Sequence, residues 1–340
     1  MPAGTGRRPR FVELDAMTTA ELLEKIAALR VLVVGDICLD RWCWYDPALG
    51  LPSAETGIPR IGVVRTEVTP GAGGTVSNNL AAIGVAGVAA LGVVGVDGYA
   101  WELRQALAAR GIDGSLLLEV PETQTFTYTK LINTETDAED LPRVDFVVTR
   151  ALSEDVEMQL VRRFLDHAER FDAIIVSDQA ETSAGGVVTP ALRGAIESIA
   201  AANPEKIVWV DSRARAERFR GVIVKPNLKE ATDASMRALG RVDFPALRAH
   251  CAAPLLVVTL GGEGARIYDA AGEYWVRAEA VPVPVDICGA GDSFSAGAAC
   301  AYAVTRDAVA SAEFGNRVAA ITIMKKGTGT ATPAELLAKG

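Results

Sequence analysis

Short apolar runs that end in a glycine or a polar residue recur along the chain, and they constrain its fold more than any other feature. The first is "RVLVVGD" at 30–36, and later ones are "DAIIVSD", "KIVWVD", "GVIVKPN" and "PLLVVTLGG". Such short, continuous runs predict strands that are buried on both faces. Helical patterns lie between several of them, at 102–110, 154–170 and 189–202. This alternation predicts an α/β fold with a mainly parallel sheet and helices on both faces.

Two segments interrupt this alternation. The stretches 43–70 and 123–150 are rich in Thr, Val, Tyr and Pro, and 125–131 alternates like a half-exposed strand. We expect the regions of about 40–70 and 120–150 to form a small β-sheet lid outside the main core. Residues 1–29 are expected to form a tail and a helix, with Thr18 and Glu21 spaced as a capping box, and 30–340 to form one domain.

Composition excludes several classes of protein. The 340 residues are 49% hydrophobic and carry a net charge of −9, which argues against nucleic acid as a partner. The longest uncharged stretch, 80–96, is cut by glycines, so no membrane span is predicted. Five cysteines without CxxC spacing favour reduced thiols and a cytoplasmic protein. Two histidines argue against a histidine-ligated zinc site or a Ser-His-Asp triad.

Polar residues end three of the predicted strands. Asp178, Asp211 and Asn227 follow apolar runs, and ligands of open α/β sheets bind outside the carboxyl ends of the strands. These side chains could therefore converge on one site. Each is equally well explained as a cap of the next helix or turn.

The run "VDICGAGDSFSAG" at 285–297 carries the most specific chemistry. It follows a run expected to be extended, and Gly289, Ala290 and Gly291 precede Asp292 and a small-residue stretch that suits a helix. Backbone N–H groups at such a helix N-terminus attract anions, and Asp292 could accept a proton from a hydroxyl. The pattern favours phosphoryl transfer. The alternative is a glycine turn with a capping aspartate. Neither a Walker A loop nor a dinucleotide fingerprint occurs.

"DICGAGDSFSAG", together with "PGAGGTVSNNLAAIG", "VVGDICLD", "KPNLKEA" and "VTLGGEGA", resembles the signatures of ribokinase-like (PfkB) carbohydrate kinases over about 30–337. "VSDQA", "VDSRARAERFRG" and "KKGTGTATPAEL" are similar to the heptose-7-phosphate kinase domain of bacterial ADP-heptose synthases. The resemblance implies transfer of the γ-phosphate of ATP to a hydroxyl of a sugar or sugar phosphate. Those synthases often carry a fused nucleotidyltransferase domain. Because the chain stops just after "TATPAEL", we expect that second activity to be absent.

The resemblance also implies roles for individual residues. Asp292 matches the family's catalytic base, and the family's anion hole is matched by Gly289, Ala290 and Gly291. The sugar-binding positions correspond to Asp40, Gly71, Ala72, Thr75 and Arg143. The ATP-binding positions correspond to Asn227, Glu230, Thr259, Gly261, Gly264 and Asn316. Glu230 also corresponds to the position at which the family holds Mg²⁺ through water.

Some positions depart from the family pattern. Glu181 stands where the heptose kinases carry a lysine, which predicts that phosphorylated acceptors are poorly favoured unless another base, Arg143 first, holds the phosphate. Ile287 and Cys288 replace hydroxyl residues near which the family often uses a monovalent cation, so that cofactor stays open beside ATP and Mg²⁺. Cys288 is either a thiol of lowered pKa at a helix N-terminus or a small buried residue.

Two other functions stay open at this point. A kinase for a nucleoside would favour aromatic residues in the lid, where Trp42, Trp44 and Tyr45 lie. A non-catalytic sugar- or nucleotide-binding protein could keep the same fold. For the kinase, we expect two lids to pack together and form a homodimer.

Overall fold

The structure is a computed structural model, and it describes residues 17–179 and 184–339. A nine-stranded sheet forms the main body, with strand order β15-β14-β13-β12-β11-β10-β1-β4-β6. Its strands are β1 Arg30–Gly35, β4 Gly87–Leu91, β6 Ile112–Asp113, β10 Ala173–Asp178, β11 Ile207–Ser212, β12 Ile223–Val224, β13 Leu256–Thr259, β14 Ala265–Tyr268 and β15 Glu273–Val276. The strands from β6 to β13 pair in parallel, and β14 and β15 add an antiparallel edge. The predicted mainly parallel α/β sheet is confirmed.

Alternate residues of the buried strands serve two apolar cores, one on each face of this sheet. Val31 and Val33 of β1 pack in the core formed with α1, α2, α3, α8, α9 and α10, whereas Leu32 and Val34 pack in the core formed with α4, α5, α6 and α7. The helices are α1 Thr19–Ile26, α2 Gly73–Ile83, α3 Gly98–Ala108, α4 Glu154–Ala168, α5 Pro190–Ala202, α6 Leu228–Leu239, α7 Phe244–His250, α8 Ala290–Thr305, α9 Ala308–Thr322 and α10 Pro333–Ala338. Burial on both faces explains why the strand sequences are continuously apolar.

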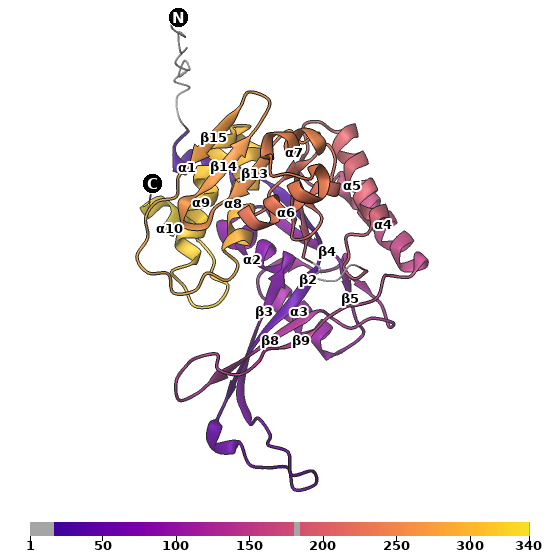
Figure 1. The fold of residues 1–340 in the computed structure, drawn as a ribbon, viewed down its shortest axis with the longest axis vertical. Coiled ribbons are helices and arrows are strands. Elements are labelled where there is room, and N and C mark those ends of the chain that lie inside the picture. Colours follow the sequence, from indigo (N-terminus) through magenta and orange to yellow (C-terminus); the bar gives the residue numbers. More distant parts are fainter. Residues whose placement is uncertain (1–16, 180–183, 340) are drawn as a thin grey trace, which may run out of the picture.

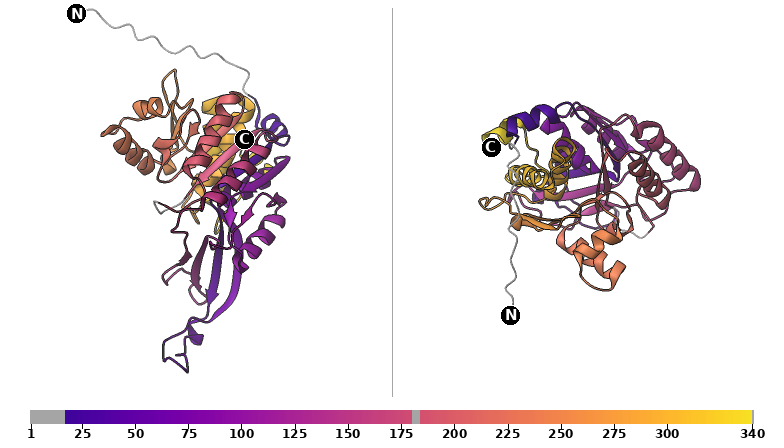
Figure 2. Two further views of the ribbon diagram at one scale, coloured as in Figure 1. Left: turned by 90° about the vertical axis from the view of Figure 1, so that its right-hand side faces the viewer. Right: turned by 90° about the horizontal axis from the view of Figure 1, so that it is seen from above.

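A second, four-stranded sheet, called here the small sheet, projects from one end of the main body (Figures 1 and 2). Its order is β3-β2-β8-β9, with β2 Ile37–Tyr45, β3 Val63–Ala72, β8 Thr127–Asn133 and β9 Val144–Phe146. Strand β2 follows β1 almost directly, so one continuous stretch of chain leaves the main sheet and enters the small one. A two-stranded pair, β5 Val93–Val94 and β7 Leu118–Glu119, completes the strands of the described regions.

Local signals read from the sequence match the structure at the helix ends and differ in one loop. Thr18 and Glu21 form the expected capping box at the start of α1. The stretch 281–286, expected to be extended, is an irregular loop with no strand partner. Proline at 282 and 284 removes two backbone donors, which explains why this segment does not join the sheet. Within the described residues, no helix is long and apolar enough to cross a membrane.

Candidate active site

The glycine turn of the GAGD run opens helix α8, as the sequence predicts. Gly289 is the N-cap residue with φ of +76°, a backbone conformation that favours glycine. A Cβ atom on Gly289 would lie 3.0 Å from the Thr75 Cγ2 atom, so the turn has little room for a side chain. The first backbone N–H groups of an α-helix have no acceptor within the helix. The positive end of the α8 dipole adds to their attraction for an anion.

Asp292 lies in the first turn of α8, beside this anion-binding end. Burial raises the pKa of its carboxyl group to about 7, repulsion by Asp211 and Asp40 acts in the same direction, and Lys225 opposes the shift. A carboxyl group with a pKa near the working pH suits a general base, because it can both accept and release a proton.

A buried ion pair lies next to Asp292. The Lys225 Nζ atom is 2.5 Å from the Asp211 Oδ2 atom, and the Ser295 hydroxyl donates to the same oxygen at 3.1 Å. A Cβ atom on Gly291 would lie 3.3 Å from Lys225 Nζ, so the ammonium group sits against the glycine turn. The sequence analysis did not select Lys225. Its only signal was its place in the "KPN" stretch after a buried strand.

The first of two pockets at the turn lies between the small sheet and the main sheet, and its volume is about 280 Å³. We call it the acceptor pocket. It is lined by Asp40, Arg41, Trp42, Ala72, Thr75, Tyr128, Lys130, Arg143, Gln179, Arg213, Cys288, Gly289, Asp292 and Thr328. Four of the five positions that the resemblance ties to sugar binding are among them. The fifth, Gly71, lies against the Asp40 carboxylate, where a Cβ atom would come within 2.6 Å of both oxygens.

Charged groups dominate the acceptor pocket. Burial raises the pKa of Asp40 to about 6, whereas Lys130 and Arg143 lower it. The Arg143 guanidinium pairs with Asp145 at 2.7 Å and stacks on the Tyr128 ring, 4.8 Å from its centroid. Carboxylates of this kind can accept hydrogen bonds from sugar hydroxyls. Glu181, on which the acceptor prediction rested, lies outside the described residues.

The second pocket lies on the other side of the glycine turn and has a volume of about 360 Å³. We call it the donor pocket. Thr259, Gly261, Gly264 and Asn316 all line it, as the resemblance implies, together with Ala290 and Gly291 of the turn and the apolar Phe294, Ile287 and Val281. Gly264 has φ of +96°, and a Cβ atom there would lie 2.1 Å from the Val276 carbonyl oxygen. The Asn316 amide donates to that same carbonyl at 3.3 Å.

Asn227 and Glu230 line neither pocket. They form a capping box at the start of α6, in which the Glu230 N–H donates to Asn227 Oδ1 at 2.9 Å and the Asn227 N–H donates to Glu230 Oε2 at 2.7 Å. The Glu230 carboxyl nevertheless interacts with the buried pair of Lys225 and Asp211. Burial and repulsion by Asp211 raise the pKa of Glu230, whereas Lys225 and Arg213 lower it. No group of three or more His, Cys, Asp and Glu residues within 17–179 and 184–339 could hold a metal ion directly.

Cys288 fits neither of its two predicted roles. The residue as a whole is exposed, but partial burial of its sulfur, together with a hydrogen bond to Asp286, raises the pKa of the thiol. Its Sγ atom accepts from Lys130 Nζ at 3.5 Å. The direction of this pKa shift is thus opposite to the lowered value expected for a thiol at a helix N-terminus.

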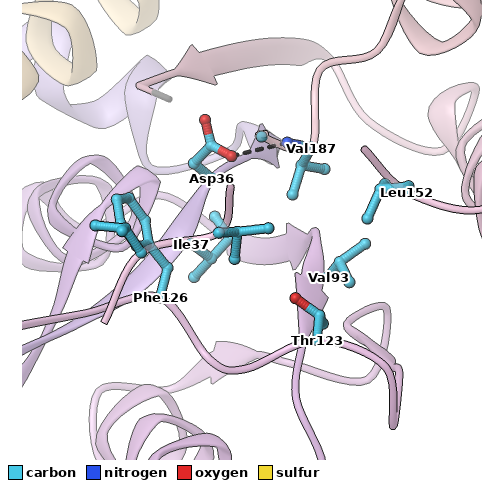
Figure 3. A pocket seen from close by; sticks show the side chains of 10 residues that line it. Asp36, Ile37, Val93, Thr123, Phe126, Leu152 and Val187 are labelled. Atoms are coloured by element: carbon cyan, nitrogen blue, oxygen red, sulfur yellow. Dashed lines mark hydrogen bonds between the residues drawn. The ribbon is translucent and has the colours of Figure 1, made fainter. Parts of the chain in front are cut away.

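A further pocket lies where the small sheet leaves the main one, and it is mostly apolar (Figure 3). Ile37, Val93, Phe126 and Leu152 line it, with the Asp36 carboxylate at one side. That carboxylate accepts from the backbone N–H groups of Gln179 and Val187, each at 2.8 Å. Because Asp36 bonds the chain on both sides of the loop after β10, we regard its role as structural.

A mainly parallel sheet, with two pockets that meet at a glycine turn, is the arrangement of a ribokinase-like small-molecule kinase. The model of the pfkB family carbohydrate kinases matches residues 31–335, and the chain belongs to this family. It is a carbohydrate kinase, and membership implies ATP as the phosphate donor.

Known proteins support this placement. The "Bifunctional protein HldE" of Trichlorobacter lovleyi is 29% identical over 96% of this chain, and the chain spans 65% of that protein's length. Phosphofructokinase-2 from Escherichia coli superimposes with a TM-score of 0.67 at 18% identity, over 91% of this chain and 97% of that one. Arabidopsis thaliana ribokinase complexed with ribose and ATP gives 0.65 at 16% identity, over 92% and 98%. The two structures show that the fold is shared.

Proposed function

We propose that this kinase transfers the γ-phosphate of ATP across the glycine turn to a hydroxyl of a sugar phosphate, in the manner of the heptose-7-phosphate kinases that its sequence resembles. One observation carries the proposal. Gly289 and Asp292 line the acceptor pocket, whereas Ala290 and Gly291 line the donor pocket. A single turn of chain therefore faces both substrates.

In this mechanism Asp292 takes the proton from the acceptor hydroxyl as the oxygen attacks the γ-phosphorus, and the bond from that phosphorus to the β,γ-bridging oxygen breaks to release ADP. The backbone N–H groups of the turn stabilise the negative charge on the phosphoryl group in transfer. Asp40 holds sugar hydroxyls, and the small sheet shields the reacting groups from water, which would otherwise compete as acceptor. The apolar wall of the donor pocket, with Phe294 and Ile287, suits the adenine base.

The residues present suit a hydrated Mg²⁺ ion. Burial and repulsion by Asp211 raise the pKa of Glu230, and a divalent cation would relieve this repulsion. We propose that Glu230, with Asn227 beside it, holds the ion through water. When bound, Mg²⁺ neutralises charge on the triphosphate. The loop before the glycine turn is less suited to binding a monovalent cation. Both carboxylate oxygens of Asp286 already accept hydrogen bonds there, from the backbone N–H groups of Cys288 and Gly327.

The described lining of the acceptor pocket favours an anionic acceptor. Four bases, Arg41, Lys130, Arg143 and Arg213, line it with two acids, Asp40 and Asp292. The prediction based on Glu181 is that phosphorylated acceptors are poorly favoured, and this lining favours the opposite outcome. No described residue tests that prediction, because Glu181 lies outside the described residues. The deciding measurement is kcat/KM for a heptose 7-phosphate against its unphosphorylated analogue, with a nucleoside in the same panel. A preference above about tenfold, equivalent to about 1.4 kcal/mol, would support the phosphorylated acceptor, and a smaller ratio would support the earlier prediction.

We also propose a homodimer formed through the small sheets. Apolar side chains are exposed on and near strand β3, including Ile58, Ile61, Val63 and Val64, and Val144 is exposed on β9. An exposed cluster of this kind is typical of an interaction surface. The molar mass in solution, measured by light scattering for the wild type and for Ile58→Glu, tests this assembly. A cytoplasmic location is proposed from the requirement for ATP and from the five unpaired cysteines.

A further inference from the structure

A third pocket, called here the outer pocket, adjoins the acceptor pocket and is larger than either active-site pocket, at about 520 Å³. Trp42 and Thr328 belong to the lining of both. The rest of the outer pocket comes from strands β2 and β3, from Asn78 of α2, from Arg110 after α3 and from the loop 325–330 after α9. None of the sugar, nucleotide or metal positions discussed above contributes a side chain to it.

Positive side chains from three distant parts of the sequence converge on the outer pocket. They are Arg65, Arg110, Lys325 and Lys326, and Glu67 is the one acid among the lining residues that the structure describes. The chain as a whole has a net charge of −9, so this concentration of bases runs against its composition. A concave, positively charged surface raises the local concentration of anions.

Arg110 is the strongest indication of a ligand. Its guanidinium is partly buried, and its hydrogen bonds go to neutral acceptors, the Ala106 carbonyl at 2.8 Å and the Thr69 hydroxyl at 3.2 Å. Burial lowers the pKa of Arg110, and it is the one cause of that shift. Among the described residues, no carboxylate therefore offsets the cost of removing this charge from water. A partly buried cation without a carboxylate partner is stabilised by an anion that binds beside it.

The other three bases differ in how far they are neutralised. Lys325 pairs with Glu335 at 2.7 Å, and Lys326 pairs with Asp137 at 2.5 Å. Arg65 stacks on the Trp44 ring, 3.7 Å from its centroid, and its contact with Glu67 is a 3.4 Å pair between two largely exposed side chains. Exposed pairs of this kind contribute little. Arg65 and Arg110 are therefore the groups best placed to bind an incoming anion.

We propose that the outer pocket is a second anion site, distinct from the active site, which binds a small phosphate-bearing ligand through Arg65 and Arg110. Pyrophosphate and the diphosphate group of a nucleotide share the required chemistry. Such a ligand would join strand β3 of the small sheet, through Arg65, to Arg110 after α3, in a pocket that the loop 325–330 also lines. That loop contacts the catalytic turn, because a Cβ atom on Gly289 would lie 3.3 Å from Thr328 Cγ2. Binding would therefore hold the small sheet in place over the acceptor pocket, whatever the acceptor is.

Tryptophan fluorescence of the full chain provides a direct test. Trp44 lines the outer pocket but neither active-site pocket. Titration with pyrophosphate, ADP and inorganic phosphate should give a saturable change in fluorescence that Trp44→Phe removes. We expect Arg110→Ala to weaken the apparent Kd at least tenfold. Arg163→Ala is the matched control, because Arg163 is also partly buried and bonds two carbonyl groups, those of Leu116 and Leu117.

Arg65→Ala is a second variant in case Arg110→Ala fails to fold, since Arg65 is exposed. It should also weaken binding, by at least threefold. The order of the three probes identifies the natural source: tighter ADP binding indicates a nucleotide, and tighter pyrophosphate or phosphate binding indicates an inorganic anion. The proposal is wrong if no probe changes the fluorescence assigned to Trp44, or if the folded arginine variants bind as the wild type does. Neither result depends on catalysis, so the kinase function is tested separately.

Discussion

The two sides of the glycine turn are built in different ways. The acceptor pocket is lined by charged side chains from two sheets, among them Asp40 and Lys130 from the small sheet and Arg213 from the main body. The donor pocket is lined by residues of the main body, in which glycines and alanines such as Gly261, Gly264 and Ala319 lie beside an apolar wall. The acceptor pocket can therefore select its substrate by charge and hydrogen bonding. The donor pocket selects its nucleotide by shape, because the glycines leave space that a side chain would fill. Substitutions on the two sides should affect different substrates.

Asp292 lines the acceptor pocket from the first turn of α8, and its replacement should have the largest effect. Asp292→Asn should lower kcat by about 10² to 10⁴, because an amide cannot accept the hydroxyl proton, while the affinity for ATP stays close to that of the wild type. Steady-state kinetics and calorimetry measure the two quantities. Asp269→Asn, in a surface turn where an amide can replace the carboxylate cap, is the control. Near wild-type turnover of Asp292→Asn would show that another group is the base.

Asp40→Ala tests the acceptor side alone. Removing a carboxylate that bonds sugar hydroxyls should cost about 1.5–3 kcal/mol, which is about a 10- to 150-fold weaker sugar affinity. ATP affinity should be unchanged, because Asp40 does not line the donor pocket. Calorimetry with each ligand separates the effects, and Asp155→Ala on the exposed surface of α4 serves as control. An equal loss for both ligands would contradict the assignment of Asp40.

Gly264→Ala tests the donor side alone. A methyl group would meet the Val276 carbonyl oxygen at 2.1 Å in a backbone conformation with φ of +96°, so the loop must shift, at a cost of about 1–3 kcal/mol. The KM for ATP should rise and the KM for the sugar should not. Gly262→Ala, with no neighbouring atom within 4 Å and an ordinary φ, should leave both unchanged. If the two variants behave alike, shape does not govern the donor pocket.

The pH dependence should be the smallest and most graded effect. Because burial and two neighbouring acids raise the pKa of Asp292 to about 7, the deprotonated base is lost as the pH falls through that value. kcat/KM should therefore decrease about tenfold for each pH unit below 7. A profile that stays flat down to pH 5.5 in a folded protein, checked by circular dichroism, would exclude Asp292 as the titrating base.

Several features of the fold and site could be predicted from the sequence because their causes are local. The apolar runs predict buried strands, Thr18 and Glu21 predict a helix start, and the glycines before Asp292 predict a turn at a helix N-terminus. Resemblance to the kinase family added the pocket positions. The structure brings most of them together, but it turns Asn227 and Glu230 into a capping box outside both pocket linings.

What the sequence by itself determined is therefore the type of each element and the chemistry of the turn, since backbone preferences and the spacing of apolar residues are local properties of the chain. Only the tertiary structure decided which side chains meet. Asp211 lies in β11 and Lys225 directly follows β12, and both reach Asp292 on helix α8, about 70 to 80 residues later in the chain. The bases of the outer pocket come from β3, from Arg110 just beyond the C-cap of α3 and from the loop after α9. Such contacts are set by strand order and packing between elements, and no local pattern records them.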